Sequence, residues 1–97
     1  MIKLYRLTTG EDIIGVFVEE TDLFEFVKKP FVLIPMQGQA GKPMQIGFHP
    51  YIPYTKDEVI KFKKANIITE VKPDTNLIEA YEKNTSNIVQ LNNKIIT

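Results

Sequence analysis

The feature that most constrains this fold is a glycine inside a run of strand-forming residues, "EDIIGVFVEE". Glycine weakens a strand, so its use there usually marks a bulge, a sharp bend or a close approach of two backbones. Ile13 and Phe17 share one strand face with Gly15, while Ile14 and Val16 lie on the other, so both faces are apolar. We therefore expect a strand bent at Gly15, with one face inside a small barrel and the other buried or in a subunit contact.

Composition limits the class of protein. The chain has 97 residues, of which 43% are hydrophobic and 25% charged, which predicts one globular domain over residues 1–97. It has no cysteine, which excludes disulfides and thiolate metal sites. No apolar run approaches the roughly 18 residues that cross a membrane, and the opening segment is too polar for a signal peptide. We expect a cytoplasmic protein without a metal or cofactor.

Charge is unevenly distributed along a chain whose net charge is zero. Residues 1–27 carry a net charge of −4, and residues 28–72 carry +5. Two interpretations are open: a basic face on a neutral protein, or solvated strand faces that differ in sign.

Turn signals divide residues 2–72 into short strand-like segments. Pro30 cannot donate to a strand ladder, so we expect a break, bulge or edge position there. Lys64, Ala65 and Asn66 form the expected tight connection between the last two strands. The pattern predicts a mainly β fold, a small and strongly bent five-stranded barrel.

A short helix is expected after the strands. Asn76, followed three residues later by Glu79, fits an N-cap with its capping-box partner, and apolar residues at helical spacing predict a helix over 77–84. Residues 85–97 show two apolar patches without a clear period. An added strand or helix in an oligomer contact and a frayed tail both fit this segment.

Two segments together carry a resemblance to a known family. "TGEDIIGVFVEETDLFEF" resembles the first motif of Sm-like proteins, a strand with an internal glycine that leads into a turn with an aspartate, here Gly15 and Asp22. "EVIKFKKANIITEVKP" resembles the second motif, in which a hydrophobic strand precedes a basic, a small and a polar residue and a short apolar strand. The chain is also similar to a group of short phage-encoded Sm-like proteins. The resemblance covers residues 2–72 and implies an Sm-like barrel.

The resemblance implies a function in binding single-stranded RNA, preferentially uridine-rich, on a closed ring of five to seven subunits. Such binding combines stacking on a side chain, reading of a base edge and a cation for the phosphate. The family's stacking residue maps onto Phe24, and its basic residue onto Lys63 or Lys64, with Asn66 beside it. Phe26 stands where the family has a base-reading asparagine, so we expect weaker or less selective binding.

Several aromatic residues admit a second interpretation. Phe24 and Phe26 share one strand face by alternation, and that face is a candidate for the core as well as for stacking. Phe48, Tyr51 and Tyr54 are candidates for a base-stacking platform, or for capping the barrel or filling a subunit interface.

The sequence offers no catalytic constellation. Glu19 and Glu20 are neighbours that point to opposite strand faces, and no base accompanies a Ser or Thr nucleophile. His49 is the one histidine and is interpreted as a loop residue between prolines, because it cannot build a zinc site without further ligands. We expect a non-enzymatic protein. The alternative to RNA binding is a protein-interaction or phage assembly module on the same barrel.

Overall fold

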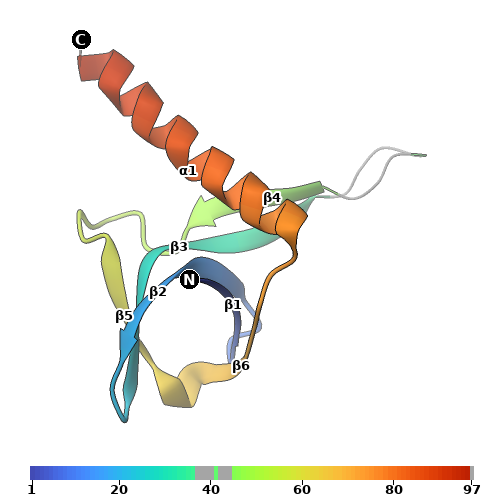
Figure 1. Ribbon diagram of the computed structural model, residues 1–97, viewed down its shortest axis with the longest axis vertical. Coiled ribbons are helices and arrows are strands. Elements are labelled where there is room, and N and C mark those ends of the chain that lie inside the picture. The colour runs from blue at the N-terminus through green and yellow to red at the C-terminus, as the bar shows by residue number, and fades with distance from the viewer. Residues whose placement is uncertain (37–40, 42–44, 97) are drawn as a thin grey trace.

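A strongly curved antiparallel sheet forms most of the protein, and one helix crosses its outer side (Figure 1). The computed structural model describes residues 1–36, 41 and 45–96, with side chains as far as Thr85. The elements are β1 (Ile2–Leu7), β2 (Asp12–Glu20), β3 (Phe24–Met36), β4 (Gln45–Pro50), β5 (Val59–Lys63), the 3-10 turn η1 (Lys64–Asn66), β6 (Ile67–Val71) and α1 (Thr75–Ile96). The strands follow the order β4-β3-β2-β1-β6 in the sheet, and β5 also pairs with β3.

The sheet curls around an apolar interior. In Figure 1, β1, β2, β3, β5 and β6 surround a central space, which side chains of these strands fill. The predicted mainly β fold with a C-terminal helix is confirmed, with one strand more than the expected five. The interior cluster consists of Tyr5, Leu7, Ile13, Val27 and Phe62, with Val32, Tyr51, Ile60 and Ile67 packed against it.

Gly15 lies at a bulge where β2 and β3 come close together. The pairing register of β2 and β3 shifts between Ile14 and Val16, which leaves Gly15 without a partner on β3, although it pairs with Lys3 of β1. A Cβ atom at this position would collide with Val27 Cγ1 and would lie 3.2 Å from the Lys28 carbonyl oxygen. The expected bend at the glycine is therefore present, and it depends on the missing side chain.

The long strand β3 changes partners at Pro30. It pairs with β5 as far as Lys28 and with β4 from Phe31 onward. Between these sections Lys29 has a φ of 50°, a left-handed conformation that is uncommon outside glycine. The expected break at Pro30 is confirmed, and it lets one strand serve both the barrel and the β3–β4 hairpin.

The helix α1 covers the second apolar face of β2. Tyr81 is buried against Ile14 and Phe31, and its ring meets the Phe31 ring edge-on at 5.9 Å between centroids. Its hydroxyl donates a hydrogen bond of 2.7 Å to the Lys29 carbonyl oxygen at the β3 bend. The sequence left open whether this face is buried within the chain or lies in a subunit contact. In the structure it is buried within the chain, under α1.

The helix begins earlier and ends later than the predicted segment over 77–84. The Asp74 carboxylate accepts a hydrogen bond of 2.8 Å from the Leu77 amide, so Asp74 is the N-cap and the expected cap at Asn76 is wrong.

The predicted end of the helix near Asn84 is also wrong. The Asn84 side chain donates a hydrogen bond to the Ala80 carbonyl oxygen at 2.8 Å, which keeps this residue within the helix. The helical backbone continues through the expected tail 85–97 as far as Ile96, while Thr97 lies outside the described residues.

Replacing Gly15 with alanine tests the close approach of β2 and β3. We expect Gly15→Ala to lower the free energy of unfolding by about 1–3 kcal/mol, because the added methyl overpacks a site lined partly by backbone atoms. Urea denaturation measures the change. Gly47→Ala is the control, since its Cβ would lie 3.4 Å from the nearest atom, Met36 Sδ, an ordinary contact. Equal stability of the Gly15 variant and the wild type would contradict the bend as described.

Candidate nucleic-acid interface

The candidate site is built where the β2–β3 turn meets η1. Phe24 begins β3 and lies opposite Lys63, the last residue of β5. The turn is closed by a hydrogen bond of 2.8 Å from the Thr21 amide to the Phe24 carbonyl oxygen, and the Phe24 amide donates to Thr21 Oγ1 at 3.1 Å. The Lys64 amide donates to the Leu23 carbonyl oxygen at 2.9 Å. The sequence-predicted tight connection at η1 is confirmed and is fixed to the turn by the backbone.

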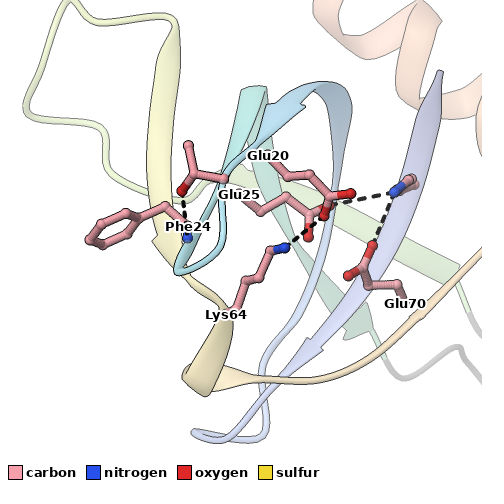
Figure 2. Close-up of polar contacts among 7 residues, drawn as sticks. Glu20, Phe24, Glu25, Lys64 and Glu70 are labelled. Carbon is pink, nitrogen blue, oxygen red and sulfur yellow. Dashed lines mark hydrogen bonds and ion pairs between the residues drawn. The ribbon is translucent and has the colours of Figure 1, made fainter.

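The four predicted site residues do not form one cluster. Phe24 and Lys63 face outward from the barrel, as a cross-strand pair. The Lys64 ammonium lies 2.9 Å from a Glu20 carboxylate oxygen, on the opposite side of the turn from the Phe24 ring (Figure 2). Asn66 is exposed, and its carbonyl oxygen accepts a hydrogen bond from the Thr8 amide at 2.8 Å. The structure therefore groups Phe24 with Lys63 and places the other two apart.

Phe24 lies on the outer face of β3. Glu25 and Val27 are fully buried on the inner face, whereas Phe24 and Phe26 alternate with them and are partly exposed. Neither phenylalanine belongs to the buried clusters, so these two side chains do not pack into the core. Both rings can be reached from solvent.

Lys61 is a functional candidate that the sequence analysis did not select. Its ammonium lies 4.5 Å from the centroid of the Phe24 ring, and its backbone lies opposite Phe26. The signal was available, because Lys61 and Lys63 alternate with buried Phe62 and so share the outer face. The Lys61 ammonium therefore covers one face of the Phe24 ring.

The cation–π contact is weak enough for a ligand to replace it. Such a contact at an exposed site stabilises by about 0.5–1 kcal/mol. Stacking of one base on an aromatic side chain is worth about 1–3 kcal/mol. A base can therefore displace the Lys61 ammonium from the Phe24 ring, which frees this cation for a phosphate.

A cluster of carboxylates from β2, β3 and β6 lies on the inner side of the sheet (Figure 2). Glu25 is fully buried, and Glu20 lies opposite it on β2. The Lys3 ammonium lies 3.5 Å from Glu25 Oε1 and 3.1 Å from Glu70 Oε1. We call Glu20, Glu25 and Glu70, with the cations Lys3 and Lys64, the carboxylate cluster. Both of its ammonium groups are paired with carboxylates, so the cluster offers no unpaired cation to a phosphate at this end of the interior.

The surroundings of Glu25 favour its protonated form. Burial raises the pKa of Glu25, and the Glu70 carboxylate raises it further. Among the described residues, no hydrogen-bond partner is found for the buried Tyr5 hydroxyl or for either carboxylate oxygen of Glu25. The hydrogen bond from Lys64, by contrast, lowers the pKa of Glu20.

The other aromatic candidates divide between packing and exposure. Phe48 packs against Tyr81, and Tyr51 against Phe62, so both serve the buried clusters. Tyr54 is 93% exposed. His49 is exposed in β4 opposite Val32, so its expected position in a loop is wrong.

Two kinds of site are not found in the part of the chain that the structure describes. No group of three or more His, Cys, Asp or Glu side chains is placed to hold a metal ion. No described helix has the length and apolar character needed to cross a membrane.

Neither the protein-family models nor the curated proteins include one that matches this chain.

Replacing Glu25 tests the electrostatics of the carboxylate cluster. Because the pKa of Glu25 is raised above the ordinary 4.5, its protonated form stabilises the fold at low pH, and this contribution is lost as pH rises through the folded-state pKa. We expect Glu25→Gln to become steadily more stable than the wild type as pH rises above 4.5. Denaturation with urea at a series of pH values measures the difference.

The control for this prediction is Glu19→Gln, because Glu19 is exposed on the same strand as Glu20. We expect its difference from the wild type to stay nearly constant across the same series. A Glu25→Gln difference that shrinks as pH rises would contradict the raised pKa.

Proposed function

We propose that this protein is a non-enzymatic, Sm-like protein that binds single-stranded RNA. The observation that carries the proposal is the outward-facing Phe24 ring, with the Lys61 ammonium over it and Lys63 opposite it. Aromatic rings interleaved with cations are the common platform for single strands, because bases stack on the rings and phosphates pair with the cations. The bent barrel and its β5–η1–β6 connection support the resemblance to Sm-like proteins.

The proposal includes assembly into a closed ring of five to seven subunits. Among the described residues, β5 pairs only with β3, and β6 pairs only with β1, so each strand has one unpaired edge. Exposed apolar side chains accompany these edges, with Val59 at 41%, Ile68 at 61% and Val71 at 49% exposure. Pairing of β5 with β6 of a neighbouring subunit removes both edges from solvent.

The proposal places the protein in the cytoplasm. The resemblance to short phage-encoded proteins extends it to a phage protein that acts in the host cytoplasm, in the recruitment or regulation of RNA.

A second candidate is a protein-interaction or phage assembly module that binds no RNA. A groove of about 840 Å³ between β1, β6 and the start of α1 favours it. Apolar side chains that include Ile2, Val16 and Ile78 line this groove, and Lys72 and Glu82 contribute charges to it. A concave surface lined mainly by apolar side chains with a few charged ones is typical of a ligand-binding site.

Titration of a fluorescent oligouridine with the purified protein separates the two candidates. Salt-sensitive binding to the oligomer supports the RNA-binding function, because phosphate contacts release counterions. An oligoadenine of the same length reports base preference. No binding up to tens of micromolar protein, together with a co-purified protein partner, would favour the interaction module.

The lysines of the candidate site are expected to contribute unequally. Lys63→Ala should weaken binding and lower the slope of log affinity against log salt by about 0.7, the value for one phosphate contact on a single strand. Lys64→Ala should have a smaller effect, because Glu20 already neutralises this ammonium. Anisotropy titration at several salt concentrations measures both. Lys56→Ala, in the exposed segment before β5, is the control, and an unchanged slope in Lys63→Ala would remove Lys63 from the site.

Ring assembly is tested at the free edge of β6. We expect the wild type to be a closed oligomer by light scattering, and Ile68→Lys to shift it toward monomer because a charge at the edge opposes strand pairing. Ile52→Lys is the control, since Ile52 is an exposed apolar residue between β4 and β5. A monomeric wild type at micromolar concentration would refute the ring.

A further inference from the structure

The outer side of β3 and β5 carries a longer surface than the predicted site. Three cross-strand pairs face outward in succession, and we call their residues the β3–β5 face. Partners in an antiparallel ladder lie on the same side of a sheet, so these side chains form two parallel rows. The pairs are Phe24 with Lys63, Phe26 with Lys61, and Lys28 with Val59.

The β3–β5 face is open to solvent and carries free cations. Phe26 is partly exposed, as Phe24 is, and Lys61 and Lys63 are exposed. None of the salt bridges within the described residues includes Lys61 or Lys63. Lys28 lies 3.9 Å from a Glu58 carboxylate oxygen, a distance at which an exposed pair is weakly held.

The charge on the two sides of this sheet has opposite sign. The inner side has the carboxylate cluster, with more carboxylates than ammonium groups. The outer side has Lys28, Lys61 and Lys63, against Glu58 beside Lys28 and Glu19 on β2, which lies opposite Phe26. A polyanion is therefore attracted to the β3–β5 face, whereas both ammonium groups of the inner side are already paired with carboxylates.

The spacing on the β3–β5 face suits an extended single strand. Side chains two residues apart on a strand lie about 7 Å from one another, so Phe24 and Phe26 present two successive rings along β3. The row of lysines runs beside these rings on β5. Bases stacked on the first row would place the sugar-phosphate backbone along the second.

We propose that the β3–β5 face is the binding track for single-stranded nucleic acid, with Phe26 as a second stacking platform and Lys61 as a phosphate contact. The track does not discriminate among bases, since every base offers a π-face to a phenylalanine ring. Among the described residues, none on this face has an amide or hydroxyl side chain that could read a base edge. This inference rests on the proposed function and specifies its ligand as a single strand of any sequence.

The test uses fluorescent single strands of oligouridine, oligocytidine and oligoadenine with the full-length protein. We expect the wild type to bind all three within a few-fold of one another. Phe26→Leu keeps an apolar side chain but removes the ring, and should weaken binding to each oligomer roughly tenfold or more. Lys61→Ala should lower the salt slope by about 0.7.

Two matched variants serve as controls for the loss of a ring and of a lysine. Tyr54→Ala removes an aromatic side chain that is 93% exposed, and Lys56→Ala removes a lysine near it, outside the β3–β5 face. Both should bind like the wild type. Thermal unfolding verifies that each variant is folded. If Phe26→Leu does not fold, Lys61→Ala still tests the track.

The outcomes separate this inference from the proposed function. A wild type that binds no oligomer overturns both. Binding that is lost in Lys63→Ala but unchanged in Phe26→Leu and Lys61→Ala overturns the track and leaves RNA binding at the turn. A wild type that binds oligouridine at least tenfold more tightly than the other oligomers overturns the lack of base discrimination.

Discussion

The close approach of β2 and β3 at Gly15 is the constraint on which the rest of the structure depends. Without a side chain at this bulge, β2 can bend while Val27 and Pro30 lie against its backbone. The bend brings β3 around the interior toward β5, and the second bend at Pro30 sends the remainder of β3 to β4. As a result one side of β3 lines the barrel, and the other side near Phe24 faces solvent. The candidate interface follows from this curvature.

The same curvature separates two electrostatic environments by the thickness of one strand. Glu25 is buried within the carboxylate cluster, and its neighbours Phe24 and Phe26 lie among lysines. Uniform mixing of charge would give a sheet with no preferred side for a polyanion. This segregation gives the protein a locally basic β3–β5 face, although the net charge is zero. It also supplies the physical basis for ligand binding on the outside of the barrel.

Local patterns were sufficient to predict the class of fold and the positions of its bends. A glycine or proline within a strand acts through its own backbone, so Gly15 and Pro30 carry their consequence in the sequence. The pairing of Phe24 with Lys63 could be inferred for a related reason, because Phe24 adjoins the β2–β3 turn and Lys63 adjoins η1, and the sequence indicates both turns. Strand alternation alone could not decide which face of β3 is buried, since it gives the same division whichever side faces the core.

Interactions between distant residues were beyond the sequence. The salt bridge between Glu20 and Lys64 and the burial of Glu25 depend on strands that meet only in the folded chain. Because Lys64 is paired with Glu20 and Lys63 lies opposite Phe24, these contacts separate Lys64 from the predicted site and leave Lys63 in it.

The most direct test of the central claim, that the outer side of the barrel is the ligand surface, is an amide NMR titration with a short single-stranded oligomer. The account predicts that chemical-shift changes concentrate in residues 24–28 and 59–63, with few changes in β1 or β6. Changes concentrated instead along the groove between β1, β6 and α1 would contradict it, as would a spectrum unaffected by the oligomer.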